Sequence, residues 1–227
     1  PDLLIVLGDR FEMAAACIAA LPLTIPVAHI HGGERTEGAY DEAFRHAMTK
    51  MSHLHFVATG EYGDRVIQLG EAPWRVTVCG APALDQVATV SRIPASDLRA
   101  RFNITTDPPP LLVTFHSTTL EYDRAAHQTD ELLGAVDASG LPAVFTLPNA
   151  DTNGGIIGQR IRAFAADRPA CQFVDNLGTR AYFSLMTIAA AMVGNSSSGI
   201  VEAASFRLPV VNIGRRQQGR LTPANVI

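Results

Sequence analysis

The chain has 227 residues, of which 47% are hydrophobic and 18% charged, and its formal net charge is −4. This composition is typical of a globular protein with one large or two small domains, and the weak acidic balance argues against a nucleic-acid-binding protein. No run of 18 apolar residues is present, and the cysteines, Cys17, Cys79 and Cys171, lie far apart in apolar segments. We therefore expect a cytoplasmic protein with buried thiols, no membrane contact and no disulfide or zinc framework.

Short apolar runs alternate with helical patterns in the first ninety residues. The runs are LLIVL, IPVAHI, LHFVAT and RVTVCG, and the predicted helices between them span 10–21, 41–51 and 61–69. Continuous apolar strands are typical of a parallel sheet covered on both faces, because the intervening helices form the crossovers. This half is therefore predicted to be α/β.

The chain turns polar after Val90. The segment RIPASDLRARFNITTDPPP, residues 92–110, contains four prolines and a short helical pattern opened by Ser96. Three consecutive prolines cannot lie inside a helix or a central strand. We therefore place a domain junction here, which gives domains of residues 1–90 and 91–227.

A second α/β series follows the prolines. Its predicted strands are residues 111–115, 142–147, 171–174, 192–194 and 209–214. Its predicted helices lie near residues 122–136, 155–166 and 180–190, and a last one begins at Ser198. Two doubly wound halves of this kind predict a ligand between the carboxyl ends of their strands.

Polar residues collect after five of the predicted strands. They are Asp9 and Arg10, His29 to Glu34, His116 to Thr119, Asn149 to Asn153, and Asn195 to Ser198. Strand ends are often polar merely because the next helix needs a cap, and a lone histidine such as His116 is often only a hydrogen-bonded structural residue. Five such clusters nevertheless make the strand ends the candidate site.

The segment GNSSSGIVEAASF, residues 194–206, ends a strand and opens a helix. Free N–H groups and serine hydroxyls at such a position hold an anion, above all a phosphate, although a plain serine cap remains an alternative. Arg215, Arg216 and Arg220 follow nearby, and their guanidinium groups favour a diphosphate. Glu202 is either a first-turn acid or an acceptor for ribose hydroxyls.

The stretch AHIHGGE, residues 28–34, presents His29 and His31 on the same side of a strand. A metal is disfavoured, because no further Cys or His has ligand spacing. Proton transfer is favoured instead, since the loops of the first half supply several carboxylates: Asp9, Glu34, Asp41 and Glu42. Crowding in a partly dry site is expected to raise some of their pKa values towards neutrality.

Five motifs together resemble the UDP-N-acetylglucosamine 2-epimerases, and the second resembles their hydrolysing, sialic-acid branch. The motifs are LGDRFE, HIHGGERTEGAYDEAFRH with the residues after it, TFHSTT, PNADTNG, and VGNSSSGIVEAASFRLPVVNIGRRQQGR. The resemblance covers nearly the whole chain. It implies two Rossmann-like domains of the glycosyltransferase-B type, a UDP-sugar substrate, no cofactor, and a homodimer or homotetramer.

The resemblance also implies roles for individual residues. Asp9 matches an essential acid/base with Arg10 beside it, Asp41 a second acid, and His116 a residue near the diphosphate or the leaving oxygen. The positions that match substrate contacts are Asn149 in the PNADTNG motif, Ser196 and Ser197 for phosphate, Glu202 for ribose, Arg216 and Arg220 for the diphosphate and sugar, and Leu177 and Tyr182 for uracil. At His31 several relatives have a glutamate, and here a glutamate, Glu34, stands three residues on; either residue could transfer the proton.

In such enzymes the C2 proton is removed, UDP is expelled to give a glycal, and water adds to give N-acetylmannosamine. Alternatives are the non-hydrolysing reaction, UDP-diacetylbacillosamine as substrate, a glycosyltransferase of the same fold, and a non-catalytic nucleotide-sugar sensor. The family's first strands and final helix have no counterpart here. Residues 1–90 then correspond to the C-terminal part of the first domain, with the carboxylates, and 91–227 to the UDP-binding domain. We expect the chain alone to be truncated at both ends, less stable and inactive.

Overall fold

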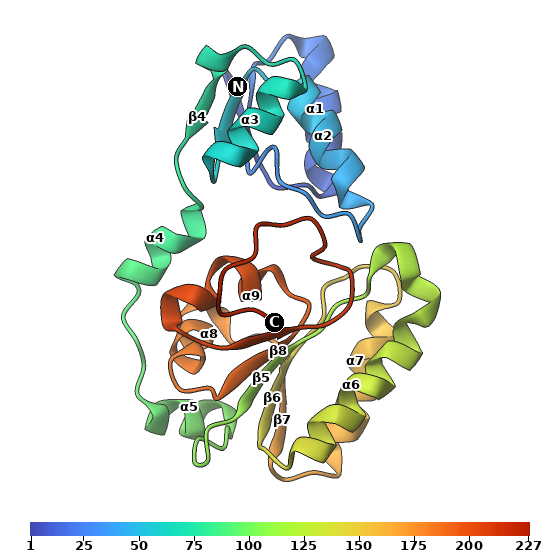
Figure 1. Ribbon diagram of the computed structural model, residues 1–227, viewed down its shortest axis with the longest axis vertical. Coiled ribbons are helices and arrows are strands. Elements are labelled where there is room, and N and C mark those ends of the chain that lie inside the picture. The colour runs from blue at the N-terminus through green and yellow to red at the C-terminus, as the bar shows by residue number, and fades with distance from the viewer. The chain divides into compact units, whose positions relative to one another are not determined.

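The computed structural model describes residues 1–227 and has the predicted α/β architecture with parallel sheets. The chain forms two compact units, which are described separately (Figure 1). The first unit is Pro1–Pro82 with Gln218–Arg220, and the second is Ala83–Gln217 with Leu221–Ile227. No helix is long and apolar enough to cross a membrane.

The first unit contains a four-stranded parallel sheet in the order β1-β2-β3-β4. Its strands are β1 (Leu4–Leu7), β2 (Val27–Ile30), β3 (Leu54–Val57) and β4 (Val76–Val78). Its helices are α1 (Phe11–Ala20), η1 (Leu21–Leu23), α2 (Asp41–Met51), α3 (Gly60–Gln68) and η2 (Pro73–Arg75). Val6 of β1 and Val27 of β2 pack with Cys17 of α1 and Met48 of α2 in one buried cluster, so these two helices share a layer against the sheet. Because β1 and β2 are parallel, the loops that follow them both lie at the carboxyl ends of the strands.

The second unit contains a five-stranded parallel sheet in the order β7-β6-β5-β8-β9. Its strands are β5 (Leu111–Thr114), β6 (Ala143–Thr146), β7 (Cys171–Val174), β8 (Ala191–Gly194) and β9 (Val210–Asn212). Its helices are α4 (Pro82–Thr89), α5 (Ala95–Phe102), η3 (Thr119–Arg124), α6 (Ala125–Ser139), α7 (Gly154–Ala166), α8 (Gly178–Met186), α9 (Ser197–Val201) and η4 (Ala203–Phe206).

Successive residues of β5 enter different cores, as expected of a strand covered on both faces. Leu111 and Val113 pack with residues of α6 and α7, whereas Leu112 packs with residues of α5 and α8. Figure 1 shows α6 and α7 side by side along one side of this sheet. Strand β5 is therefore buried on both faces of the sheet.

The division into units falls earlier than the junction placed after Val90. Helix α4 belongs to the second unit because Val87 and Val90 pack against its core, beside Ile93 and Leu98. The sequence analysis did not predict α4, in which no residue is fully buried. The expectation of three buried thiols is also wrong in part, because Cys79 is exposed while Cys17 and Cys171 are buried.

Candidate functional site

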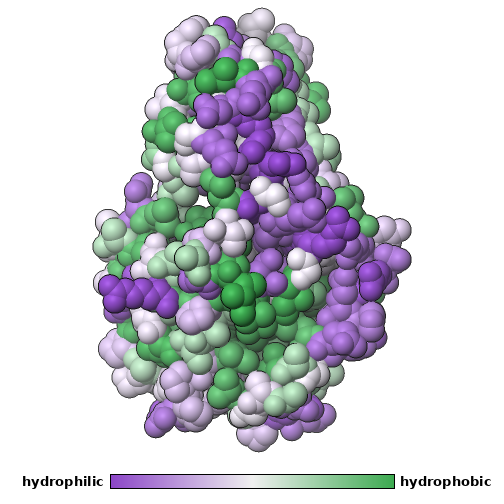
Figure 2. All heavy atoms as spheres, viewed as in Figure 1, coloured by the Kyte–Doolittle hydropathy of each residue, from purple (hydrophilic) through white to green (hydrophobic).

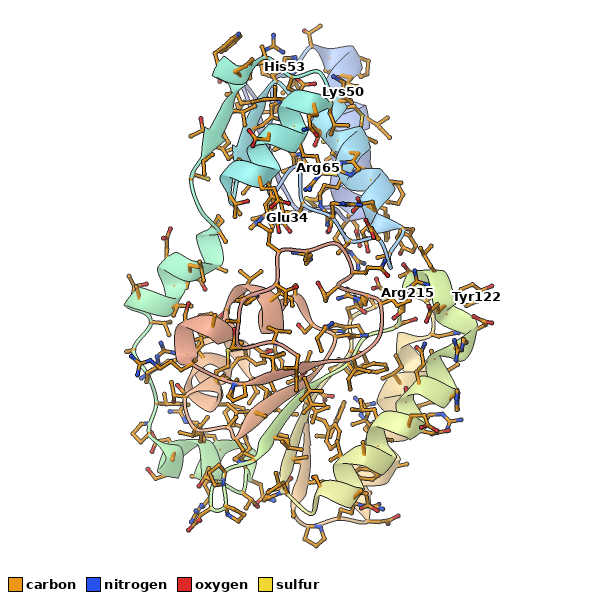
Figure 3. The ribbon with its side chains drawn as sticks, viewed as in Figure 1. Glu34, Lys50, His53, Arg65, Tyr122 and Arg215 are labelled. Atoms are coloured by element: carbon orange, nitrogen blue, oxygen red, sulfur yellow. The ribbon has the colours of Figure 1, made fainter.

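The loop after β2 turns back on itself and brings Glu34 to His31. Both His31 (φ +67°) and Gly33 (φ +75°) adopt the left-handed conformation. At Gly33 a Cβ atom would lie 2.1 Å from the carbonyl oxygen of Tyr62, so only glycine fits there. A left-handed histidine costs conformational energy and is found where surrounding contacts hold it, which is common at functional sites. Glu34 lies at the opposite end of this unit from His53 and Lys50 (Figure 3).

The Glu34 carboxylate has a partner at each oxygen. Nδ1 of His31 lies 2.6 Å from Oε1, and Nη1 of Arg220 donates to Oε2 at 2.5 Å. The Glu34 side chain is 5% exposed and that of His31 18%. Arg220 belongs to the first unit, where it lies beside Glu34 and His31, and it is not among the residues that line the pocket of the second unit.

Arg45, on α2, organises the carboxylates of this unit and was missed by the sequence analysis. It is 1% exposed and its guanidinium donates to the Asp9 carboxylate, to Oε2 of Glu42 at 3.0 Å and to the backbone oxygen of Glu34 at 3.2 Å. The spacing of Glu42 and Arg45, three residues apart on one helix face, was the available signal. The contact with Asp9 spans 36 residues and leaves no local signal.

The carboxyl groups of Glu34 and Glu42 have pKa values below their ordinary values. Burial raises the pKa of Glu34, but the hydrogen bond with His31 and the charges of Arg220 and Arg45 together outweigh it, so the pKa lies below its ordinary value. Burial likewise opposes the shift at Glu42, where hydrogen bonds with His46 and the Thr36 N–H, together with Arg45, lower the pKa to about 2. The expectation that crowding raises the pKa values of these two carboxyl groups is therefore wrong, because the site is built around cations.

Two further predicted residues flank this cluster. Asp41 is the first residue of α2 and is 5% exposed. Arg10 precedes α1, and its guanidinium pairs with Glu12 at 3.4 Å. Arg10 is thus directed along its own helix, while Asp9 beside it is held by Arg45. Hydrophilic side chains cover the face of the first unit around the start of α2 (Figure 2).

His29 is a structural residue and not a ligand beside His31. It is fully buried, and its Nε2 lies 2.8 Å from the carbonyl oxygen of Gly8. Burial lowers the pKa of His29 to about 4, so the ring is neutral and its Nε2 carries the hydrogen. The structure brings together no group of three or more His, Cys, Asp or Glu side chains that could hold a metal ion.

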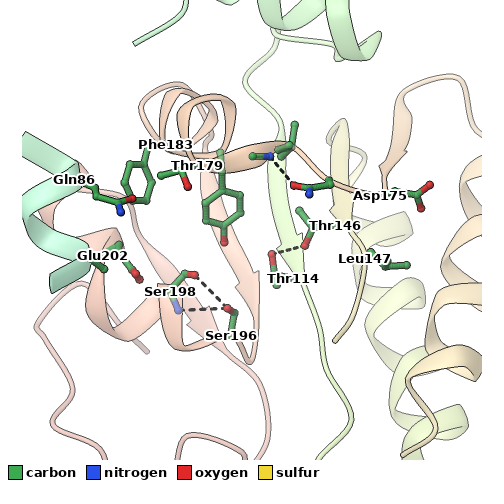
Figure 4. Close-up of a pocket in the computed structure, with 15 residues that line it drawn as sticks. Gln86, Thr114, Thr146, Leu147, Asp175, Thr179, Phe183, Ser196, Ser198 and Glu202 are labelled. Atoms are coloured by element: carbon green, nitrogen blue, oxygen red, sulfur yellow. Dashed lines mark hydrogen bonds between the residues drawn. The ribbon is translucent and has the colours of Figure 1, made fainter. Parts of the chain in front are cut away.

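The second unit contains a pocket of about 580 Å³ at the ends of β5, β6 and β8 (Figure 4). Predicted site residues that line it are Leu177, Tyr182, Ser196 and Glu202. Other lining residues include Gln86, Thr114, Thr146, Leu147, Asp175, Thr179, Phe183 and Ser198. Hydroxyl groups, the carboxylates of Asp175 and Glu202, and apolar side chains thus face a volume suited to a nucleotide-sized ligand.

Residues 194–199, which we call the serine loop, contain two glycines at positions where the backbone packs too closely for a side chain. A Cβ on Gly194 (φ +139°) would lie 2.0 Å from the carbonyl oxygen of Thr114, and one on Gly199 would lie 2.9 Å from Cγ1 of Val210. Ser196 caps α9, accepting a hydrogen bond from the Ser198 N–H at 3.3 Å. Ser198 lines the pocket, and Ser197 is not among its lining residues.

His116 is held by two asparagines. Its backbone N–H donates to Oδ1 of Asn195 and its carbonyl oxygen accepts from Nδ2 of Asn195, both at 2.8 Å. The backbone N–H of Asn149 donates to Nδ1 of His116 at 3.0 Å. Nδ1 is therefore an acceptor, and the neutral ring carries its hydrogen on Nε2.

Asn195 also connects the serine loop to the segment after β9. Its carbonyl oxygen accepts hydrogen bonds from Nη1 of Arg216 at 3.2 Å and from Nε2 of Gln217 at 2.8 Å. Gln217 and Asn195 are both buried; Asn195 is one of the strand-end polar residues named from the sequence, whereas Gln217 was not singled out. Asn195 is the first residue of the motif NSSSG, and its side-chain amide bonds to the backbone of His116, which explains why an asparagine precedes the serines.

Comparison with known proteins gives a consistent result over the whole chain. Residues 1–227 match the family described as UDP-N-acetylglucosamine 2-epimerase. The chain is 39% identical over 229 residues to the GDP/UDP-N,N′-diacetylbacillosamine 2-epimerase (hydrolyzing) of Campylobacter jejuni, covering 100% of this chain and 60% of that protein. It is 40% identical over 227 residues to the UDP-N,N′-diacetylbacillosamine 2-epimerase (hydrolyzing) of Legionella pneumophila, with the same coverage of 100% and 60%.

The fold agrees with a solved structure of the same kind. The chain is similar to the UDP-GlcNAc 2-epimerase from Neisseria meningitidis bound to UDP-GlcNAc, with a TM-score of 0.75, 18% identity, and coverage of 93% of this chain and 59% of that one. The chain thus spans about 60% of the length of the curated relatives it matches. The predicted fold class is confirmed, and the chain belongs to the UDP-N-acetylglucosamine 2-epimerase family.

Proposed function

We propose that the full-length protein is a hydrolysing 2-epimerase of a UDP-linked 2-acetamido sugar. The observation that carries this proposal is the whole-chain identity of 39% and 40% to two relatives named as hydrolysing 2-epimerases. The structure supports it with a pocket of nucleotide size in one unit and a cluster of buried acids and cations in the other. A non-catalytic nucleotide-sugar sensor would need the pocket but not the cluster of buried acids and cations.

The proposed reaction has two steps. A base removes the proton on C2 of the sugar while the bond between C1 and the UDP oxygen breaks, which forms a C1–C2 double bond and releases UDP. Water then adds across that double bond, with a proton delivered to the opposite face of C2 and hydroxide to C1. The products are UDP and the free sugar with inverted configuration at C2.

The acid/base groups in this proposal belong to the first unit. Asp9, held by Arg45, is available for proton transfer, and so is His31, held by Glu34. Asp41, buried at the start of α2, is a second acid. General acid/base catalysis by positioned groups of this kind contributes about 10²- to 10⁴-fold in rate.

The nucleotide is proposed to occupy the pocket of the second unit. Leu177 and Tyr182 would pack on the base, Glu202 would accept hydrogen bonds from the ribose hydroxyls, and Ser196 with Ser198 would donate to a phosphate. Burial raises the pKa of Tyr182 above its ordinary value, so its phenol is neutral and can donate.

His116 is proposed to assist the departure of UDP. Because the Asn149 N–H occupies its Nδ1, the neutral ring has an N–H to donate only at Nε2. A donor directed at the oxygen on which charge develops lowers the barrier to bond breaking.

The sugar favoured by the comparisons is UDP-N,N′-diacetylbacillosamine, after the names of the two relatives. UDP-N-acetylglucosamine is the second candidate, because the family that matches the whole chain carries that description. Incubating the full-length protein with each compound, and following UDP by phosphorus NMR and the sugar by proton NMR, tests the proposal. A 2-epimerised UDP-sugar that accumulates without release of UDP would contradict it.

A further inference from the structure

His31 is fixed at both its backbone and its ring. Its backbone N–H donates to the carbonyl oxygen of Phe56 at 3.0 Å, which continues the pairing of β2 with β3 beyond the end of the strand. The ring is held at Nδ1 by Glu34, 2.6 Å away. The left-handed backbone at His31 brings Glu34 back to the ring, so the contact between the two side chains depends on this turn.

Both oxygens of Glu34 are occupied. Oε1 contacts His31 and Oε2 accepts from Arg220, and the residue is 4% exposed. Burial raises the pKa of Glu34, but His31, Arg220 and Arg45 together lower it further than burial raises it, so the group is a carboxylate at neutral pH. A carboxylate can only accept hydrogen bonds, so the hydrogen between the two residues belongs to Nδ1 of His31.

We propose that Glu34 is a positioning residue, which holds His31 with its hydrogen on Nδ1 and so leaves Nε2 as the atom that exchanges a proton with the substrate. This inference rests on the proposed 2-epimerase function. It resolves a choice that the sequence left open, because it assigns the proton transfer to His31 and gives Glu34 the role of fixing the tautomer and orientation of the ring. Arg220 in turn holds the carboxylate in place.

The geometry disfavours the reverse assignment. Both oxygens of Glu34 already accept hydrogen bonds, from His31 and from Arg220, and taking a proton from a substrate would remove the negative charge that both contacts use in a site that excludes most water. His31 needs no such change, because Nε2 is free of the contact that fixes Nδ1. An imidazole oriented by a carboxylate at one nitrogen and reactive at the other is a recurrent arrangement for proton transfer.

The tautomer can be measured without any substrate. Full-length protein labelled with ¹⁵N-histidine is examined by long-range ¹H–¹⁵N NMR, and the His31 signal is assigned by its loss in His31→Gln. We expect the neutral ring to carry its hydrogen on Nδ1 in the wild type and to shift towards the Nε2–H form in Glu34→Gln. A wild-type ring with its hydrogen on Nε2 would overturn the proposal, whether or not any variant folds poorly.

Kinetic measurements on two variants distinguish the proton-transfer role of His31 from the positioning role of Glu34. In His31→Gln, exchange of the substrate C2 proton with solvent should fall by about 10²- to 10⁴-fold, the contribution of a general acid/base. In Glu34→Gln, kcat should fall by about 10- to 100-fold, typical of a partner that orients a functional histidine, with KM nearly unchanged. Loss of exchange in Glu34→Gln equal to or larger than that in His31→Gln would overturn the assignment.

Glu37→Gln is the matched control. Glu37 lies in the same loop and also pairs with an arginine, Arg35, but it does not contact His31. We expect its tautomer signal and kcat to match the wild type; a shift as large as that of Glu34→Gln would contradict a specific role for Glu34. If the wild type released no UDP from any UDP-sugar, the proposed function would fail, while the NMR result would still decide how Glu34 holds His31.

Discussion

Arg45 is almost fully buried and donates a hydrogen bond to the carboxylate of Asp9, which lies 36 residues earlier at the end of β1. The same guanidinium contacts the Glu42 carboxylate and the backbone oxygen of Glu34. One side chain therefore joins the ends of β1 and β2 to the start of α2. Arg45 thus holds the Asp9 carboxylate in place beside the loop that carries His31 and Glu34.

Replacing Arg45 by methionine should be strongly destabilising. The change keeps the apolar stem but leaves the Asp9 and Glu42 carboxylates and a buried carbonyl without their donor, and removing one partner of such a network costs about 3 kcal/mol. Urea unfolding of the full-length protein measures the effect. Arg160→Met, which breaks an exposed pair with Asp130, should cost less than about 1 kcal/mol. Equal losses in both variants would contradict a special role for Arg45.

Gly33→Ala should destabilise the turn that carries Glu34. The residue has φ +75°, and its new Cβ would lie 2.1 Å from the Tyr62 carbonyl oxygen, so the backbone must move. We expect a loss of about 2–3 kcal/mol, the range for strained backbone together with steric overlap. Gly60→Ala is the control, because no atom lies within 4 Å of its added Cβ. Thermal unfolding of the two variants compares them directly, and a Gly33→Ala protein as stable as Gly60→Ala would show that the turn tolerates a side chain.

Stability should fall as the pH drops from 6.5 to 4, because of His29. Burial lowers its pKa from 6.5 to about 4, so over this range the unfolded chain binds a proton on His29 that the folded protein does not. The interval between the two values corresponds to about 3 kcal/mol at most. His29→Gln retains a donor for the Gly8 oxygen and should flatten this part of the profile of unfolding free energy against pH. An unchanged slope would contradict the assignment; His127→Gln, on the exposed side of α6, is the control.

Glu202→Gln should weaken the binding of UDP. If the carboxylate accepts hydrogen bonds from ribose hydroxyls, its neutral replacement loses about 1–2 kcal/mol, or roughly tenfold in Kd. Calorimetric titration of the full-length protein with UDP provides the measurement. Glu131→Gln, on the exposed face of α6, should bind as the wild type does. An unaltered Kd in Glu202→Gln would remove Glu202 from the proposed nucleotide site.

Two substitutions test the donor assigned to His116. Asparagine can place an oxygen near the position of Nδ1 and keep the bond from Asn149, but it has no group at Nε2; glutamine can place an amide N–H near Nε2. If Nε2 donates to the leaving oxygen, His116→Gln should retain more kcat than His116→Asn, which should lose about 10²- to 10³-fold. The opposite order would indicate that the contact with Asn149 is the more important one.

The sequence predicted most elements of this fold because its patterns are local. The bounds of α2 and β7 match the predicted ranges 41–51 and 171–174. An amphipathic helix and an apolar strand can each be recognised from the pattern of a few consecutive residues. Helix α4 was missed, and its place in the second unit follows only from that unit's core, against which Val87 of α4 and Val90 just after it pack. Cys79 was misjudged for the same reason, because the apolar segment around it does not reveal that β4 lies at the edge of its sheet.

The candidate site was predictable in its residue types but not in its pairings. The strand-end clusters identified His31, Glu34 and His116, yet no local pattern shows that Arg220 bonds to Glu34 across 186 residues. The pKa of Glu34 is lowered by the hydrogen bond with His31 and by the charges of Arg220 and Arg45, and neither arginine is adjacent to Glu34 in the sequence. The pairing of Asn195 with His116 was hidden in the same way, across 79 residues.

The most direct test of the proposed function is one reaction in ²H₂O with full-length protein and UDP-N,N′-diacetylbacillosamine or UDP-N-acetylglucosamine. The proposed mechanism predicts that UDP and the free sugar appear together, that the sugar has inverted configuration at C2, and that C2 carries deuterium. Asp9→Asn should slow both UDP release and deuterium uptake. Release of UDP with the original proton and configuration retained at C2 would contradict the mechanism.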